Sequence, residues 1–343
     1  MTHRALRLRL DTDALQSNWR WLDRVSGSRA GAAVKADGYG LGAVEVTTRL
    51  SGVGCRNFFV STWAEAEALG KLPEGVSLAV LHGVGPDDAD AALSGIARPV
   101  LNTPQQVARW KEIAPGKACD VMVDTGMNRL GIRTDELEVL DSLAIDTLMS
   151  HLASADEDSA LNRIQLDRFR GVKAAVAAKR YSLANSAGIC LGPDYGFDLV
   201  RPGLALYGGL PREEAWGHIR QVATPEAEVI QRRTVRAGES IGYGATWVAD
   251  ADTEAAILNV GYADGYLRCF AGKGAAIVDG QRLPLIGRVS MDLVAIDCSA
   301  APDLAEGDWA ALEYSLPEAA DASGLSQYEL LTGLSDRFER LWS

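Results

Sequence analysis

The sequence predicts an α/β protein in which a (β/α)₈ TIM-like barrel is followed by a mostly antiparallel C-terminal β domain. Three observations lead to this prediction. The chain has 343 residues, more than the roughly 250 to 300 at which a single core stops growing. Short apolar runs alternate with helix-like segments as far as about residue 221. Beyond that point shorter strands are joined by tight turns.

The barrel prediction depends on eight short apolar runs, each followed by turn or capping residues. Continuous apolar strands that alternate with helices are typical of parallel strands covered on both faces. Eight such units within about 200 residues fit a closed barrel better than an open sheet. The runs are residues 32–36, 57–62, 77–83, 98–103, 119–126, 146–153, 181–188 and 197–208.

Two of the segments between these runs carry clear helix signals. The segment "DTDALQSNWRWLDR" begins with Asp capping candidates and places Leu15, Trp19 and Leu22 on one face. The segment "TPQQVARWKEI" opens with Thr103 as N-cap and Pro104 at the first helical position. Both predict amphipathic helices that cover a sheet.

The last third of the chain has the pattern of an antiparallel β domain. Its short strands are separated by the turns "VRAGES", "VDGQR" and "AEGDW". Within the second of these, Asp279-Gly280 is a hairpin signal. We therefore expect a barrel domain at 11–221 and a β domain at 222–343.

Composition excludes several classes of function. A net charge of −12, from 34 Lys+Arg and 46 Asp+Glu, argues against nucleic acid or an anionic membrane as the main partner. The five scattered cysteines form no C-x-x-C pair, which suits a reducing compartment and indicates no metal site. The N-terminus lacks the pattern of a secretory signal, and no apolar stretch approaches the ~20 residues of a membrane helix. We expect a cytoplasmic protein.

Polar residues stand at the ends of five of the predicted strands. Active sites of (β/α)₈ barrels form at these carboxyl ends, and phosphate groups often bind beyond strands 7 and 8. Residues from different strands should therefore meet at one mouth. They are Lys35, Arg129, His151, Asn185 with Ser186, and Arg201 with Pro202 and Gly203.

A lysine among these groups suggests carbonyl chemistry. A lysine beside a carbonyl partner can form a Schiff base, and pyridoxal phosphate combines an aldehyde with a phosphate. Ser186 and the backbone N–H groups of Gly203 and Leu204 are candidate phosphate donors, because glycine lets a ligand approach the backbone closely. Tyr39 could add a phenolic hydroxyl. Composition and spacing do not name the reaction.

Eight motifs in one order resemble the alanine racemase family of fold type III pyridoxal-phosphate enzymes. They span almost the whole chain: "VKADGYG", "VDTGMNRLGI", "SHLASADE", "NSAG", "RPGLALYG", "IGYGATW", "VGYADGYLR" and "IGRVSMDLVAID". The resemblance implies racemisation of L-alanine and D-alanine, which supplies D-alanine for peptidoglycan. It also implies that residues 1–10 join the C-terminal domain and that two subunits form a homodimer with shared active sites.

Carried over residue by residue, the resemblance implies two proton-transfer bases. Lys35 matches the Schiff-base lysine, which is also one base, and Tyr243 matches the opposing base supplied by the other subunit. Racemisation needs both, because a proton leaves one face of Cα and returns on the other. Arg201 matches the arginine that hydrogen-bonds the pyridine nitrogen, and His151 would orient Arg201.

The other site residues are also carried over from the resemblance. The phosphate contacts are Tyr39, Ser186, Gly203 and Leu204, with Asn185 in support. Arg129 and the Met291 backbone match groups that hold the substrate carboxylate, with Asp292 beside them. The narrow entrance that admits only small amino acids matches Asp156, Tyr262, Arg268 and Arg288. On sequence alone, Asp156 could instead cap a helix.

The chain departs from the family at positions that affect substrate binding. Many members have a lysine, often carbamylated, where this chain has Met122, so Arg129 must be held by another residue or by an anion such as chloride. A tyrosine that some members place near the C-terminus aligns with Asp336. Three alternatives stay open: racemisation of serine or another small amino acid, a barrel-type decarboxylase, and a non-catalytic cofactor-binding module.

Overall fold

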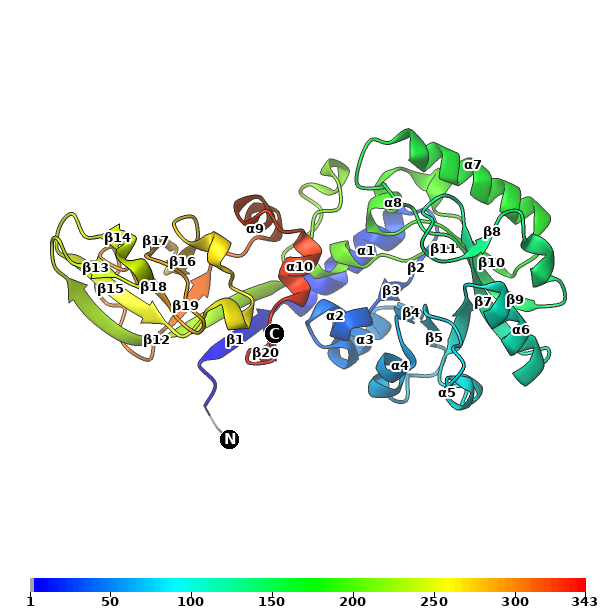
Figure 1. Ribbon diagram of the computed structural model, residues 1–343, viewed down its shortest axis with the longest axis horizontal. Helices are drawn as coiled ribbons and strands as arrows, with labels where there is room; N and C mark the ends of the chain where they lie inside the picture. The colour runs from blue at the N-terminus through cyan, green and yellow to red at the C-terminus, as the bar shows by residue number, and fades with distance from the viewer. Residues whose placement is uncertain (1–2) are drawn as a thin grey trace. The chain divides into compact units, whose positions relative to one another are not determined.

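The computed structural model describes residues 3–343 and divides into two compact units. One unit consists of Asp13–Arg220, and the other combines the chain up to Thr12 with Gln221–Ser343. The first unit is a parallel barrel with helices around it, and the second is a β domain (Figure 1). The predicted fold class is confirmed.

The parallel strands of the first unit follow one another in chain order. Successive strands pair in the order β3, β4, β5, β6, β7, β9 and β10. Their bounds are β3 Ala32–Ala33, β4 Asn57–Val60, β5 Ser77–Val80, β6 Arg98–Leu101, β7 Ala118–Asp124, β9 Ala144–Met149 and β10 Arg180–Ser182. Short β8 (Ile132–Arg133) pairs with the end of β7.

The eighth predicted strand closes the ring. Strand β11 (Leu199–Val200) pairs in parallel with β2 (Arg29–Ala30), which leads directly into β3. On its other side, Arg201 N–H donates to Ala184 C=O at 2.9 Å, just beyond β10. All eight predicted strands are therefore present, although each spans fewer residues than its apolar run.

The helices lie between the strands, as the alternation predicts. Helix α1 (Thr12–Val25) buries Leu15, Trp19 and Leu22, and the Thr103 hydroxyl caps α6 (Pro104–Ile113) by accepting from Gln106 N–H. Both sequence-based helix predictions are confirmed. The remaining α-helices of this unit are α3 Ala43–Gly52, α4 Trp63–Leu69, α5 Ala89–Leu93, α7 Ala160–Ala175 and α8 Ser186–Cys190. The segment labelled α2, Lys35–Tyr39, is a turn whose interior residues have positive φ and are not helical.

A layer of apolar side chains fills part of the barrel interior. It contains residues from six strands that pack together: Phe59, Ala79, Val100, Met122, Met149 and Leu199. Close packing of branched and flexible apolar side chains makes the inside of such a barrel a core and not a pore.

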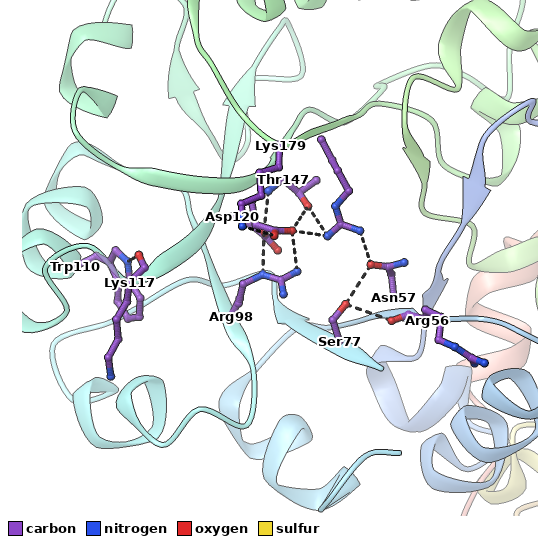
Figure 2. A network of polar contacts seen from close by, with 11 residues as sticks. Arg56, Asn57, Ser77, Arg98, Trp110, Lys117, Asp120, Thr147 and Lys179 are labelled. Carbon is purple, nitrogen blue, oxygen red and sulfur yellow. Dashed lines mark hydrogen bonds and ion pairs between the residues drawn. The ribbon is translucent and has the colours of Figure 1, made fainter. Parts of the chain in front are cut away.

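The amino ends of the same strands carry a network of charged and polar groups (Figure 2). The Asp120 carboxylate accepts from Arg98 Nε at 3.2 Å and from Thr147 N–H at 2.9 Å. Asp146 pairs with both Arg98 and Arg180. Burial raises the pKa of Asp120. These ion pairs and hydrogen bonds tie strands β6, β7, β9 and β10 together at their amino ends.

The second unit contains a sheet that closes on itself. The strand order is β15, β18, β17, β16, β19, β12, β1 and β20, with β15 also paired to β12. Strand β1 (Leu6–Leu10) runs antiparallel to β12 (Ala223–Val235) and parallel to β20 (Glu339–Trp342). The others are β15 Thr253–Leu258, β16 Ala275–Val278, β17 Gln281–Ile286, β18 Val294–Asp297 and β19 Trp309–Leu312.

Local turns of this unit follow the sequence signals. Asp279 and Gly280 both have positive φ, 48° and 78°, and they join β16 to β17. This is the two-residue hairpin that the dipeptide predicts. A second hairpin, β13 (Ser240–Ile241) with β14 (Trp247–Val248), carries a short 3₁₀ turn, η5 (Tyr243–Ala245). Helices α9 (Leu316–Ser323) and α10 (Gln327–Thr332) follow β19.

None of the helices within residues 3–343 has both the length and the apolar character needed to span a bilayer. The five cysteines are all free thiols.

Candidate active site

Lys35 stands at the start of an unusual turn beyond β3. The next four residues, Ala36 to Tyr39, all have φ between 50° and 63°. A left-handed turn costs L-residues roughly 1–2 kcal/mol each, and such strain is concentrated at functional sites. Two hydrogen bonds stabilise the turn, from Gly38 N–H to Val34 C=O and from Gly40 N–H to Ala36 C=O, both 2.9 Å.

Four basic side chains gather at the carboxyl end of the barrel. Burial and the charge of Arg129 lower the pKa of Lys35, while Glu65 acts in the opposite direction. Enclosure by protein, with the charges of Arg201, Arg129 and Lys35, lowers the pKa of His151 to about 3. His151 is therefore neutral near pH 7. In a chain of net charge −12, this mouth is locally positive and suits an anionic ligand.

The Arg201 guanidinium is buried and fixed by groups from neighbouring strands. It donates to the Ser182 hydroxyl and to Ser150 C=O, the latter at 2.6 Å. Burial lowers its pKa to about 10, and the charge of Asp120 opposes this. Arg201 thus stays protonated near neutral pH. No hydrogen bond joins it to His151 within the described chain, so the serine groups hold the guanidinium.

A set of hydroxyl and backbone donors lies beside these cations. The Ser186 hydroxyl accepts from Gly203 N–H at 3.0 Å and from Ala205 N–H at 3.2 Å. Gly203 has no side chain, and a Cβ there would stand 2.1 Å from the Tyr39 hydroxyl oxygen. Leu204, the first residue of the 3₁₀ turn η3 (Leu204–Tyr207), is buried beside them. Asn185 caps α8 by accepting from Gly188 N–H at 2.8 Å.

Two observations test whether a phosphate-bearing aldehyde fits here. The Ser186 hydroxyl contacts the Gly203 and Ala205 N–H groups, and the Tyr39 hydroxyl lies beside Gly203, which has no side chain. Hydroxyl and backbone N–H groups of this kind suit phosphate oxygens. The Lys35 amine, with its lowered pKa, is the nucleophile that an aldehyde needs. The donor set and the amine fit pyridoxal phosphate.

The second unit holds another group of predicted site residues. Tyr243 lies on η5 and is 73% exposed. It lines a hollow of about 380 Å³ together with Arg268, Ala271, Arg288 and Val289. The Arg268 guanidinium lies over the Tyr262 ring, 4.9 Å from its centroid. Four of the predicted residues therefore share one region of this unit.

Met291 and Asp292 lie next to that region in the chain. Tyr262 N–H donates to Ser290 C=O and Ala263 N–H to Met291 C=O, both at 3.0 Å. Asp292 pairs with Arg337 at 2.8 Å, and the same arginine contacts buried Asp264 at 3.2 Å. The Asp292 carboxylate is thus already engaged by a cation of its own unit.

The remaining predicted residues differ in their surroundings. Asp156 is exposed, and Ser159 caps α7, so the alternative that Asp156 caps a helix is wrong. Met122 lies in the apolar layer, an environment that fits methionine.

Arg129 is exposed and makes no hydrogen bond or ion pair with any residue in 3–343. The Asp336 side chain is fully exposed, and its nearest cation is Arg340 at 3.8 Å.

Two residues near the site carried a weaker sequence signal. Glu65 accepts from Ala36 N–H at 2.8 Å, directly after Lys35. The Thr62-x-x-Glu65 spacing predicts a capping box but not a contact with another strand. Gln165, fully buried on α7, donates to His151 C=O at 2.9 Å and accepts from Ala153 N–H at 2.9 Å. Nothing in its sequence context points to this role.

Both units of the chain match domains of a known protein family. The alanine racemase N-terminal domain matches residues 10–211, and the alanine racemase C-terminal domain matches residues 222–342. An alanine racemase of Dinoroseobacter shibae is 40% identical, over 97% of both chains. A catabolic alanine racemase of Agrobacterium fabrum is also 40% identical, over 97% of this chain and 91% of that protein.

Solved structures give the same result for the fold. The crystal structure of alanine racemase from Bartonella henselae, with covalently bound pyridoxal phosphate, is 32% identical and has a TM-score of 0.90. The similarity covers 99% of this chain and 100% of that one. With both domains matched and relatives at 40% identity over nearly the full length, the chain belongs to the alanine racemase family.

Proposed function

We propose that this protein is a pyridoxal-phosphate-dependent racemase that interconverts L-alanine and D-alanine through two bases, Lys35 and Tyr243 of the partner subunit. The observation that carries the proposal is the position of Lys35 among basic groups, four residues before Tyr39, whose hydroxyl lies beside Gly203. The Gly203 N–H in turn donates to the Ser186 hydroxyl. We assign the barrel, 11–221, to cofactor binding and 222–343 with 1–10 to the β domain.

The cofactor supplies an aldehyde that captures an amine and a ring that stabilises negative charge at the neighbouring carbon. The protein would bind the cofactor phosphate through two hydroxyls and two backbone N–H groups. These are the hydroxyls of Tyr39 and Ser186 and the N–H groups of Gly203 and Leu204, with Asn185 in support. Arg201 would donate to the ring nitrogen. A guanidinium keeps its proton, so the nitrogen would stay unprotonated and the ring would be a weak electron acceptor.

Each base would act on one face of the substrate Cα. Lys35 has a pKa lowered by burial and by the charge of Arg129, so its amine is more available as a base near neutral pH. Tyr243 of the partner subunit would serve the opposite face. One group removes the proton and the other returns a proton, which inverts the centre.

The substrate would be held by its carboxylate and limited by size. Arg129 has no acidic partner among residues 3–343, so its guanidinium is available for a carboxylate. The Met291 backbone would add a donor beside Asp292. Tyr262, Arg268 and Arg288, with Asp156, would narrow the entrance to small amino acids.

The homodimer follows from the second base. Tyr243 is 73% exposed on a hairpin of its own unit, which suits a side chain that completes a site in another subunit. We place the enzyme in the cytoplasm, where it would supply D-alanine for peptidoglycan. Relatives of about equal similarity include a catabolic and a biosynthetic alanine racemase of one organism, so growth assays must decide the physiological role.

The first test is incubation of the purified protein, pyridoxal phosphate and L-alanine in D₂O. Deuterium at Cα by NMR and D-alanine by chiral chromatography are the expected results. L-serine in the same assay measures substrate range. Release of carbon dioxide would identify a decarboxylase, and bound cofactor without Cα exchange would identify a non-catalytic binder.

A further inference from the structure

The Glu65 carboxylate connects the start of α4 to the turn that follows Lys35. One oxygen, Oε2, accepts from Ser61 N–H at 2.6 Å and from Thr62 N–H at 3.2 Å, which completes the capping box of the helix. The other oxygen, Oε1, accepts from Ala36 N–H at 2.8 Å. A single side chain thus binds backbone groups beyond both β3 and β4.

A second strand-to-helix junction of the barrel has the same construction with a different residue. Gln106 occupies the third helical position of α6, as Glu65 does in α4. Its Oε1 accepts from Asn102 N–H at 2.7 Å, four residues back, as Glu65 accepts from Ser61. Its Nε2 donates to His82 C=O at 2.9 Å, just beyond the preceding strand β5.

The two junctions differ in the polarity of the backbone group beyond the preceding strand. At β5 that group is a carbonyl, which needs a donor, and glutamine supplies an N–H. At β3 it is the Ala36 N–H, which needs an acceptor, and only a carboxylate accepts at both ends. Ala36 is the first residue of the left-handed turn, with φ 51°. Glutamate at position 65 therefore matches the unusual backbone beside Lys35.

We propose that Glu65 is a positioning residue for Lys35, because its hydrogen bond to Ala36 N–H holds the peptide between residues 35 and 36 in the left-handed turn. This inference rests on the proposed role of Lys35 in capturing the cofactor aldehyde. The Lys35 carbonyl and the Ala36 N–H share that peptide plane. Fixing the N–H therefore fixes the direction from which the Lys35 side chain leaves the backbone.

The charge of Glu65 gives a second, separable effect. Burial and Arg129 lower the pKa of Lys35, and Glu65 partly offsets them. His151 also faces Lys35, but with a pKa of about 3 it is neutral near pH 7. Glu65→Gln should therefore lower the pKa of Lys35 further, whereas Glu65→Asp keeps the charge but is one methylene too short to reach both ends.

The test uses full-length protein freed of cofactor and compares Glu65→Gln with the reciprocal exchange Gln106→Glu. Both are isosteric, and each breaks one contact between strand ends, so they should lower the melting temperature to a similar degree. Pyridoxal phosphate is added over a range of pH, and its attachment to Lys35 is trapped with borohydride and quantified by peptide mass. Hydrogen exchange of residues 35–40 reports on the turn.

We expect Glu65→Gln to reduce the limiting rate of attachment by about tenfold or more, as displacement of a reacting group does. Its pH profile should move to lower pH, and exchange in 35–40 should accelerate. Gln106→Glu should leave all three unchanged. If Glu65→Gln does not fold, Glu65→Asp takes its place, with a reduced limiting rate and an unshifted pH profile.

The possible failures are distinguishable. Suppose that wild type attaches the cofactor at Lys35 and that the Glu65 variants show the same attachment rate and the same hydrogen exchange of residues 35–40. That result would overturn this inference and leave the proposed function intact. A wild-type protein that attaches no cofactor at Lys35 would overturn the proposed function, and the role of Glu65 with it. If Gln106→Glu loses attachment to the same degree, Glu65 only stabilises the barrel in general. The claim that it positions Lys35 would then be refuted.

Discussion

The Tyr39 hydroxyl lies where a side chain on Gly203 would begin, only 2.1 Å from the position of a Cβ on that residue. Tyr39 is buried and stacks on Tyr207, with ring centroids 4.6 Å apart. The stacking restrains the ring, and glycine at position 203 leaves the space that the phenol hydroxyl occupies.

Gly203→Ala should weaken cofactor binding because the new methyl group displaces the Tyr39 hydroxyl. The φ of Gly203 is −129°, outside the left-handed region, and the close approach of the Tyr39 hydroxyl makes a steric effect the expected one. We expect the dissociation constant of pyridoxal phosphate, measured by fluorescence titration, to rise by about tenfold, the loss of roughly one hydrogen bond to a charged group.

The matched control is Gly171→Ala in α7, where a Cβ meets nothing within 4 Å. Alanine inside a helix is favoured over glycine by about 1 kcal/mol. This variant should bind cofactor normally and melt at a slightly higher temperature. Unchanged cofactor affinity in Gly203→Ala would show that the Tyr39 hydroxyl does not bind the phosphate.

Mixing two inactive variants tests whether the bases come from different subunits. Lys35→Ala and Tyr243→Phe each remove one base, so each homodimer should be nearly inactive. In a mixed dimer one site lacks both bases and the other keeps both. Random exchange of subunits with C₂ symmetry should restore about a quarter of wild-type turnover, measured by D-alanine formation.

Restored activity should depend on subunit exchange, since unfolding and refolding the two variants together is what forms mixed dimers. Variants refolded apart and then combined on ice provide the comparison. Failure to recover turnover after joint refolding would place both bases in one chain.

His151→Gln should alter how stability depends on pH. The pKa of His151 is about 3 in the folded protein, against 6.5 for the ordinary side chain. Between these values the unfolded chain binds the proton and the folded protein does not, so stability falls as pH decreases below 6.5. The loss approaches roughly 1.4 kcal/mol per pH unit between these two pKa values and fades above pH 6.5.

The measurement is urea unfolding at pH 7 and pH 5. Wild type should lose more stability than His151→Gln over this interval, by about 1–2 kcal/mol. Parallel losses in the two proteins would show that the imidazole titrates normally in the folded state.

Asp120→Ala should destabilise the barrel from its amino end. Asp120 is fully buried, and its loss leaves the Thr147 N–H without an acceptor and Arg98 with only Asp146. Removing one partner from a buried ion pair costs about 3–5 kcal/mol. Urea unfolding should show this as a lower midpoint with a similar slope.

Asp135→Ala is the comparison, because the Arg133–Asp135 pair is exposed on both sides. Solvent screens such exposed pairs, so they contribute little to stability. A small effect at Asp120, similar to that at Asp135, would show that the network in Figure 2 adds little to stability.

The sequence predicted the order of elements well, because hydrophobic periodicity and caps are local. Eight apolar runs became eight strands, and Thr103 with Pro104 opened α6. Asp279-Gly280 formed its hairpin for the same reason, since positive φ at two adjacent residues is a property of the dipeptide.

Side-chain contacts between different strands could be identified only from the tertiary structure. The spacing of Thr62 and Glu65 predicts a capping box, but the bond from Ala36 to Glu65 joins residues 29 positions apart. The same holds for Ser182 and Ser150, which accept hydrogen bonds from Arg201. The family resemblance implied His151 in this position, and no local pattern pointed to the two serines. Such partners are set by which strand ends lie side by side.

By itself the sequence determined the (β/α)₈ barrel with its β domain and the motifs that place this chain in the alanine racemase family. Periodicity, turn chemistry and motif order are written along the chain. Only the tertiary structure decided that the peptide after Lys35 is left-handed and bound to Glu65, and that Met122 lies in an apolar layer. The left-handed conformation of a turn and the neighbours of a side chain depend on segments that are distant in sequence and pack against them. No local sequence pattern encodes these contacts.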